Sequence, residues 1–473
     1  MSVQGADFGG DPRRTIRLKQ VVSLLAKQPT AMLPKAMRSE SELEAMYRFV
    51  NNRRVKMDAI VEAQAAETAR RARSETLLLA IHDTTSLECP HAPAADVGYL
   101  NTGKPGFYAH YSLIVGANSR RPLGISYLET ISRKTPPRRR KTKGSPRRKK
   151  SGAQTRKKPN REFERWGRGI RTTETRLGGR PIVHIADRES DSFELMAQCL
   201  EANSRFVFRA RIPERRALSA DGESGAVVEL AAKAQGVLTR EIGVSARKPT
   251  TAPQSAKVHP PRMARLATLR FSATPLQLHR PKYLGAAFPA TVNVNLVRVW
   301  EPDPPPGVES IQWLLFTTEP IKTKADIEAV VDMYRARWLI EECNKALKTG
   351  CQIESRQFES LHAMLVMLAL SLPIACEILA LRAVSRENPN RPATEILGRT
   401  QLEILRRVGS RKLPAKPTAR EALLAVAALG GHQRSNGDPG WEILLRGMTE
   451  LQAYEVGWRA RARREPRGDG TDL

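Results

Sequence analysis

The sequence has few cysteines, and no two of them are placed as a close pair. Five cysteines are scattered over 473 residues, and no C-x-x-C spacing occurs. A disulfide framework needs an even, regularly spaced set, and structural zinc sites use closely paired thiols. The cysteine pattern therefore argues against both, and it is typical of a protein kept in a reducing cytoplasm.

Long hydrophobic segments are also missing. The first residues include Asp7, Asp11 and two arginines, which interrupt any apolar core of a signal peptide. The segment 363–376 is apolar apart from one serine, but it is short for a membrane span and contains Pro373. We predict that this segment is part of a buried core helix.

Acidic residues are too few to balance the basic ones. Lysine and arginine total 78 against 49 for aspartate and glutamate, which leaves a formal charge of +29. An excess of this size favours a polyanionic partner, nucleic acid first and an anionic membrane surface second. Segment 133–161 holds fifteen basic residues and no acid. It predicts a disordered insert that binds phosphates without reading sequence, and the alternative is a solubilising or localising tail.

Two apolar runs lead into aspartates. The run 77–81 is followed by Asp83, and the run 181–186 leads directly into Asp187. Continuous apolar runs of this length are typical of buried central strands, and sites gather at the carboxyl ends of such strands. We therefore predict that both aspartates lie at strand ends. Each has a structural alternative, because Asp83 can cap a turn and Asp187 can cap the helix that follows.

A third acid, Glu341, lies in a segment with helical periodicity. Four residues of this segment fall within an arc of roughly 60° on one helix face: Tyr334, Arg337, Glu341 and Lys348. This stripe would combine a metal ligand, two phosphate-binding cations and a ring that can stack on a base or sugar. The alternative for Glu341 is an ion pair with Arg337 or Lys345 at helical spacing.

These motifs follow one another in the order found in one family. The first aspartate lies in Asp83-Thr84-Thr85-Ser86-Leu87, and the second lies in Asp187-Arg188-Glu189. The helical signature reads Tyr334-x2-Arg337-x3-Glu341-x6-Lys348. Together with an N-terminal segment, Gly10-Asp11-Pro12-Arg13-Arg14-Thr15 and Arg17-Leu18, they resemble the DDE transposases of the insertion-sequence-four family.

The resemblance implies an α/β fold with a ribonuclease-H-like catalytic core and a β-rich insertion, flanked by N- and C-terminal helical domains. A helical DNA-binding domain is expected over 1–60, the catalytic domain over 61–384 and a helical dimerisation domain over 385–473. Within the catalytic domain, the basic insert spans 133–161 and the β-rich insertion spans about 213–318.

The resemblance also assigns roles to residues of the catalytic site. Asp83, Asp187 and Glu341 would be the catalytic carboxylates and would bind two Mg²⁺ ions, with Mn²⁺ as a substitute. The implied activity is cut-and-paste DNA transposition, in which the enzyme cleaves transposon ends and joins the 3′-hydroxyl to target DNA. A hairpin intermediate is expected between these steps.

Further residues are expected to contact DNA. Trp313 would stack on a base extruded from the duplex, and Trp338 would help to hold that distortion. Without the resemblance, Trp313 is better explained as a core residue of a sheet. The other DNA contacts implied are Tyr334, Arg337, Lys348, Arg209, Arg211, Arg13, Arg14 and Arg17.

The expected partners are double-stranded DNA, both transposon ends and target, and a second copy of the chain in a homodimer. No membrane partner is expected, and the expected location is a bacterial-type cytoplasm, with the protein on the nucleoid. Two alternatives stay open. One is a metal-dependent nuclease of the same fold without strand transfer, and the other is an inactive DNA-binding relative of a transposase.

Overall fold

The computed structural model divides into two compact units. Unit one comprises residues 1–147, 168–181 and 338–473, and unit two comprises residues 148–167 and 182–337. The residues described are 8, 11–27, 33–37, 39–137, 161–244, 246, 261–358, 360–433 and 437–462. Most of the basic insert 133–161 predicted from the sequence therefore lies outside the described residues.

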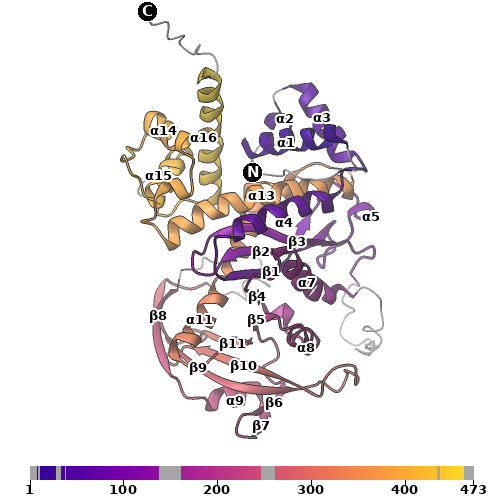
Figure 1. Ribbon diagram of the computed structural model, residues 1–473, viewed down its shortest axis with the longest axis vertical. Coiled ribbons are helices and arrows are strands. Elements are labelled where there is room, and N and C mark those ends of the chain that lie inside the picture. The colour runs from indigo at the N-terminus through magenta and orange to yellow at the C-terminus, as the bar shows by residue number, and fades with distance from the viewer. Residues whose placement is uncertain are drawn as a thin grey trace, which may run out of the picture. The chain divides into compact units, whose positions relative to one another are not determined.

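Unit one contains an antiparallel sheet in the order β3-β2-β1, formed by β1 (Leu78–Glu88), β2 (Gly106–Gly116) and β3 (Pro122–Ile131). Strand β1 pairs with β2 along its whole length. Helices α4 (Met57–Ala72) and α13 (Leu361–Glu387) pack against β3, as Figure 1 shows. Unit one also holds α5 (Ala94–Val97) and most of α7 (Arg165–Leu177).

Helix α13 is the predicted core helix. It is long and apolar enough to cross a membrane, but 78% of its most apolar window is buried inside the protein. The helix continues through Pro373, which has no N–H to bond the carbonyl of Ala369 one turn earlier. Gln64 on α4 donates its Nε2 to that carbonyl at 2.6 Å. The prediction of a buried helix is confirmed, and a side chain from α4 supplies the hydrogen bond that proline removes.

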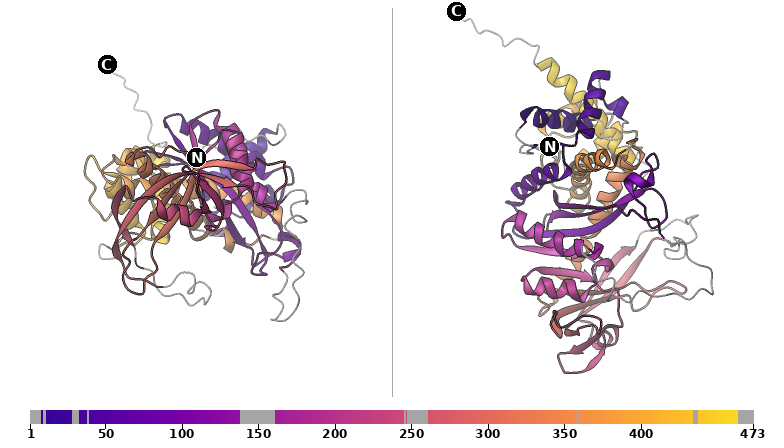
Figure 2. Two further views of the ribbon diagram at one scale, coloured as in Figure 1. Left: turned by 90° about the horizontal axis from the view of Figure 1, so that it is seen from below. Right: turned by 90° about the vertical axis from the view of Figure 1, so that its right-hand side faces the viewer.

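The N- and C-terminal regions of unit one are helical. The first contains α1 (Pro12–Lys27), α2 (Leu33–Ala36) and α3 (Glu40–Asn51). The last contains η5 (Ala393–Glu395), α14 (Arg399–Val408), α15 (Ala419–Leu429) and α16 (Trp441–Ala462). Figures 1 and 2 agree in placing α14 and α15 beside α16. Their apolar faces share one hydrophobic cluster, which includes Leu402, Leu405, Leu423, Val426 and Leu444.

Unit two is dominated by a mixed sheet in the order β4-β5-β11-β10-β9-β6-β7, with β8 paired to β9. The first pair, β4 (Ile182–Ala186) and β5 (Arg205–Arg209), is parallel. The other pairings are antiparallel. The remaining strands are β6 (Arg216–Ser219), β7 (Ser224–Ala226), β8 (Leu238–Val244), β9 (Arg265–His279), β10 (Thr291–Trp300) and β11 (Gln312–Thr317). The helical elements are η1 (Glu162–Glu164), η2 (Arg188–Ser190), α8 (Phe193–Glu201), α9 (Val227–Lys233) and α11 (Lys324–Arg335).

The α/β fold class expected from the sequence is confirmed. A mixed sheet that begins with a parallel pair, together with helices before and after it, fits a ribonuclease-H-like core. One detail of the prediction is wrong. Asp83 does not lie at the end of a strand, because β1 continues to Glu88. Beyond Asp83 the strand buries Thr85 and Leu87 on alternate positions, and β-branched and apolar residues with this period extend a strand.

Candidate active site

Asp187 lies where the sequence placed it, immediately after β4. It caps the short helix η2, and its Oδ1 accepts a hydrogen bond from the backbone N–H of Glu189 at 2.9 Å. Asp187 is therefore a helix cap, as the structural alternative predicted, but the donor that binds its carboxylate is a neutral N–H group. A neutral N–H orients a carboxylate without cancelling its charge, so the same group can also bind a cation.

Two rings and two arginines gather near Asp187 in unit two. The rings of Trp313 and Tyr334 meet edge to face, with centroids 5.5 Å apart. The guanidinium of Arg209 lies 5.9 Å from the centre of the Trp313 ring, and that of Arg337 lies 6.0 Å from the centre of the Tyr334 ring. The structure therefore brings together four residues that the sequence selected as DNA contacts.

The electrostatics of this cluster connect it to Asp187. Burial raises the pKa of the Tyr334 phenol; the two arginines lower it, and the Asp187 carboxylate raises it further. Burial also lowers the pKa of Arg209. Tyr334 is only 4% exposed, so its ring supports Trp313 from within the protein. The positive charge of this cluster comes from Arg209 and Arg337, which are both half-buried.

The predicted stripe on a single helix does not form. Helix α11 ends at Arg335, α12 (Trp338–Lys345) begins after two intervening residues, and Lys348 falls in the π-helix η3 (Ala346–Gly350). The N–H of Ala336 bonds to carbonyls three and four residues back, and the N–H of Arg337 bonds to a carbonyl three residues back. Such bonds tighten the end of a helix, so a constant step of 100° per residue does not hold across this segment. Tyr334 and Arg337 belong to unit two, whereas Glu341 and Lys348 belong to unit one.

In unit one, Asp83 is held by a side chain of α12. The Nδ2 of Asn344 donates to the Oδ2 of Asp83 at 3.0 Å. Asn344 follows Glu341 by three residues on α12, so the two side chains share one face of that helix. Asp83 and Glu341 are both half-buried. A strand carboxylate and a helix bearing a second carboxylate are thus linked within unit one.

The neighbouring acid, Glu342, has a different environment. It is 7% exposed and bonds to Arg382 at 2.8 Å and to Lys345 at 3.0 Å. A carboxylate paired with two cations is a structural ion pair, which supports the choice of Glu341 over Glu342 as the functional residue. Lys348 also has a partner, since its Nζ lies 3.6 Å from Glu354.

The other predicted DNA contacts differ in exposure, and Arg211 is exposed. Trp338 is 51% exposed, and the ammonium of Lys345 lies 4.9 Å from the centre of its ring. On α1, Arg13 is exposed and Arg17 is half-buried, whereas Arg14 pairs with Asp11 at 3.3 Å.

Sequence reasoning missed three residues that hold these groups in place. Asn344 and its partner Tyr111 support Asp83, and Asp191 supports the loop after β5. Asp191 is fully buried at its side chain and accepts from the backbone N–H of Arg211 at 2.6 Å, besides its ion pair with Arg215. The clue for Tyr111 was its position opposite Asp83, which the sequence could give only once the strand register was known.

The carboxylates fit a hard divalent cation by their chemistry. Oxygen ligands suit Mg²⁺, and Asp83 and Asp187 are both oriented by neutral nitrogen donors. Within the part of the chain that the structure describes, no group of three or more His, Cys, Asp or Glu residues is gathered as a metal site. The roles of Asp83, Asp187 and Glu341 as metal ligands therefore stay a prediction.

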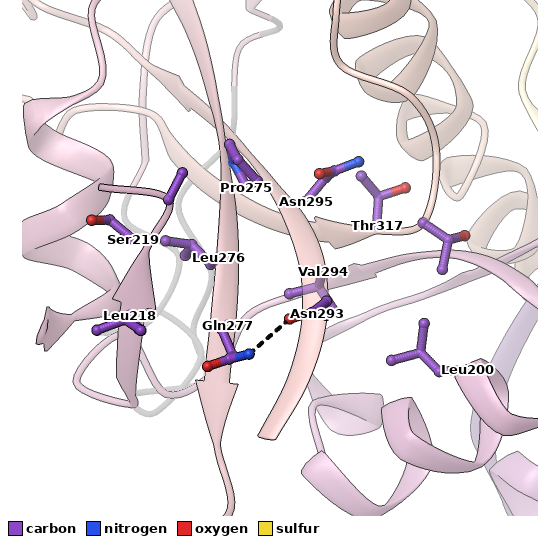
Figure 3. A pocket seen from close by; sticks show the side chains of 12 residues that line it. Leu200, Leu218, Ser219, Pro275, Leu276, Gln277, Asn293, Val294, Asn295 and Thr317 are labelled. Carbon is purple, nitrogen blue, oxygen red and sulfur yellow. Dashed lines mark hydrogen bonds between the residues drawn. The ribbon is translucent and has the colours of Figure 1, made fainter. Parts of the chain in front are cut away.

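A separate pocket of about 450 Å³ lies on the sheet of unit two (Figure 3). Its polar groups are neutral amides and hydroxyls, and the Nε2 of Gln277 donates to the Oδ1 of Asn293 at 3.2 Å. None of its twelve lining residues is charged. It therefore lacks the groups that bind phosphate or Mg²⁺, and we do not include it in the candidate active site.

Two protein families match this chain, one at its N-terminus and one over its central part. A family described as Transposase DNA-binding matches residues 1–55, and a family described as Transposase DDE domain matches residues 139–374. Among solved structures, the chain resembles a piggyBac transposase synaptic complex with hairpin DNA at 8% identity and a TM-score of 0.34. That match covers 97% of this chain and 74% of the other, and it is too distant to add to the argument. The two family matches show a transposase DNA-binding domain and a DDE transposase domain in this chain, which supports a DDE transposase.

Proposed function

We propose that the protein is a cut-and-paste transposase of the insertion-sequence-four type, with Asp83, Asp187 and Glu341 as its catalytic carboxylates. In the first step, a water oxygen attacks the phosphorus at the transposon end, and the 3′ oxygen leaves as a hydroxyl. That hydroxyl then attacks the opposite strand to form a hairpin. After the hairpin is opened by water, the 3′-hydroxyl attacks target DNA and joins it. Each step is a phosphoryl transfer with an oxygen nucleophile and an oxygen leaving group.

The three carboxylates would hold two Mg²⁺ ions, which Mn²⁺ could replace. When bound, such ions lower the pKa of the attacking oxygen and stabilise the leaving one. The chain's own contribution is to orient the carboxylates. Asn344 donates to Asp83, and the backbone of Glu189 donates to Asp187.

The cluster beside Asp187 would hold distorted DNA. Trp313 offers a half-buried ring backed by Tyr334, and Arg209 and Arg337 lie beside these rings. Stacking on an aromatic ring is worth about 1–3 kcal/mol per base, which offsets part of the cost of extruding a base. The arginines would bind the flanking phosphates. Lys348, Arg211, Trp338 and the arginines of α1 would make further contacts with DNA.

One observation carries this proposal: a carboxylate at a strand end lies near two arginines and two rings that meet edge to face. A carboxylate can hold a metal ion, an arginine can bind phosphate, and an aromatic ring can stack on a base. The match to a DDE domain over 139–374 includes Asp187, Glu341 and the whole cluster, whereas Asp83 lies outside it. The assignment of Asp83 is supported instead by its sequence motif and by its hydrogen bond to Asn344, on the helix that carries Glu341.

The domain boundaries, the dimer and the cytoplasmic location belong to the same proposal. Residues 1–60 would bind transposon ends, 61–384 would catalyse, and 385–473 would pair two copies of the chain. The helices of the last segment share a hydrophobic cluster, which also includes Leu381 of α13. A dimer would let one complex hold both ends of the element.

The first prediction concerns the carboxylates. Replacing Asp83, Asp187 or Glu341 by alanine should lower the rate of Mg²⁺-dependent end cleavage by about 10³-fold, because several kcal/mol of transition-state stabilisation is lost. End binding, measured by gel shift in EDTA, should change little. Glu189→Ala is the matched control, since Glu189 lies two residues from Asp187 but is exposed and pairs with Arg165. Cleavage that survives Asp83→Ala would show that Asp83 is not a metal ligand.

A second assay separates the transposase from a nuclease of the same fold. Purified protein is incubated with Mg²⁺, labelled end DNA and a supercoiled target plasmid. The transposase produces end DNA covalently joined to plasmid, with hairpin ends detectable on denaturing gels. Cleaved ends without any joined product would show that the protein is a nuclease without strand transfer. DNA binding without cleavage would show that it is an inactive, DNA-binding relative of a transposase.

A further inference from the structure

The carboxylate of Asp83 is connected to the sheet by a short chain of hydrogen bonds. The Nδ2 of Asn344 donates to its Oδ2 at 3.0 Å. The hydroxyl of Tyr111 in turn donates to the Oδ1 of Asn344 at 2.8 Å. All three residues belong to unit one. A hydroxyl, an amide and a carboxylate therefore form one directed chain that ends at a candidate metal ligand.

The direction of this chain follows from the chemistry of its members. An ionised carboxylate only accepts hydrogen bonds, so the amide must present its NH₂ group to Asp83. The opposite amide orientation would place two acceptor oxygens 3.0 Å apart. With its nitrogen committed to Asp83, the Asn344 amide presents its oxygen to Tyr111, which must therefore donate.

The position of Tyr111 makes it a rigid anchor for this chain. It lies on β2 directly opposite Asp83 on β1, and its side chain is fully buried. Burial first, then the neighbouring Cys343 thiol and the Asp83 carboxylate, hold the pKa of the phenol well above its ordinary value. The hydroxyl therefore keeps its proton and stays a donor throughout the pH range in which DNA is handled.

The position of Asn344 connects the two carboxylates of unit one. It lies on α12 three residues after Glu341, on the same helix face. Its amide thus binds the strand that carries Asp83 to the helix that carries Glu341. A displacement of α12 would move both carboxylates together.

We propose that Asn344 is a positioning residue for the metal site, which orients the Asp83 carboxylate while Tyr111 fixes the orientation of the amide. The proposal rests on the proposed metal-dependent function. Groups that hydrogen-bond to a metal ligand orient it and tune its affinity, and their loss typically costs 10–100-fold in metal binding or activity. Asn344 contacts a ligand and not the reacting atoms, so its effect passes through Asp83.

The decisive substitution is Asn344→Asp, because it keeps the shape of the side chain and replaces the donating NH₂ by an acceptor. Mn²⁺ binding to the full chain without DNA is measured from the EPR signal of the free ion. We expect Asn344→Asp and Asn344→Ala to weaken Mn²⁺ binding about 10-fold or more. The Mg²⁺ concentration for half-maximal cleavage should rise by a similar factor. Thermal melting of each variant shows that it is folded.

Tyr111→Phe provides the test of the chain itself. It keeps the ring and removes the hydroxyl, so the amide oxygen of Asn344 loses the hydrogen bond that anchors it to β2. We expect a loss of Mn²⁺ affinity smaller than that of Asn344→Ala. In the double variant the two losses should not add, because both act through the same amide. Asn344→Ala should likewise cause no further loss of Mn²⁺ affinity in the Asp83→Ala background.

The outcomes separate this proposal from the proposed function. Normal Mn²⁺ affinity and normal Mg²⁺ dependence in a folded Asn344→Asp variant would overturn the positioning role, while wild-type cleavage would leave the transposase intact. Additive losses in the double variant would show that Tyr111 and Asn344 act separately. If wild type itself shows no Mn²⁺ binding that depends on Asp83, the metal role of Asp83 fails, and the role of Asn344 fails with it.

Discussion

At the scale of single residues, two adjacent glutamates lie in different environments. Glu342 is buried and paired with Arg382, whose side chain is 12% exposed and whose guanidinium lies 4.4 Å from the centre of the Trp441 ring. Removing one partner of a buried ion pair leaves the other charge without compensation. The Glu342–Arg382 pair thus fixes helix α12 to α13, while the neighbouring Glu341 is the residue proposed as a metal ligand.

The second prediction concerns this pair. Glu342→Ala should destabilise the protein by about 3 kcal/mol, because Arg382 is left buried without its partner. The free energy of unfolding is measured by urea denaturation. The control is Glu223→Ala, which breaks a pair whose side chains are 61% and 50% exposed and should cost less than about 1 kcal/mol. Equal losses in the two variants would show that burial does not set the strength of the Glu342 pair.

The residues of the site were predictable to different degrees. The position of Asp187 followed from the apolar run before it, because a buried strand has a clear end. The position of Asp83 did not, since Thr85 and Leu87 extend β1 beyond the apolar run. The burial of Tyr334 was also hidden, because it depends on Trp313, which comes from a strand 21 positions earlier in the chain. Local periodicity cannot report contacts of that kind.

At the scale of elements, the sequence predicted strands and helices better than their ends. The apolar run 181–186 contains strand β4, which spans Ile182–Ala186. The helix break between α11 and α12 was missed, because no glycine or proline marks it and the tightening is set by backbone bonds at Ala336 and Arg337. The continuation of α13 through Pro373 could not be predicted from local sequence either, because the hydrogen bond to the Ala369 carbonyl comes from Gln64 of α4.

The third prediction is a double-mutant cycle on that proline. Gln64→Leu removes the only side-chain donor described at the Ala369 carbonyl and should cost about 1–3 kcal/mol. Pro373→Ala restores a backbone N–H that can bond the same carbonyl. In the Pro373→Ala background, Gln64→Leu should therefore cost at least 1 kcal/mol less, measured by urea denaturation. Costs that are equal in both backgrounds would mean that Gln64 stabilises the helix by packing and not by this hydrogen bond.

At the scale of the whole molecule, charge is the dominant property. The formal net charge is +29, and segment 133–161 alone holds fifteen of the basic residues. Contacts of Lys and Arg with phosphate release counterions, so they determine how binding depends on salt rather than which sequence is bound. We therefore expect the insert to raise affinity for any duplex and to leave the choice of transposon ends to other residues.

The fourth prediction tests this division. Residues 138–160 contain twelve Lys and Arg, and replacing them by a Gly-Ser linker of equal length should weaken binding to end DNA and to unrelated DNA by similar factors. The slope of log K against log salt should become shallower by about 2 or more, since each lost phosphate contact removes about 0.9 from it. A variant with the insert's own residues in scrambled order is the matched control and should keep the wild-type slope. An unchanged slope in the Gly-Ser variant would show that the insert does not bind DNA. A scrambled variant that loses preference for end DNA alone would show that the insert reads sequence.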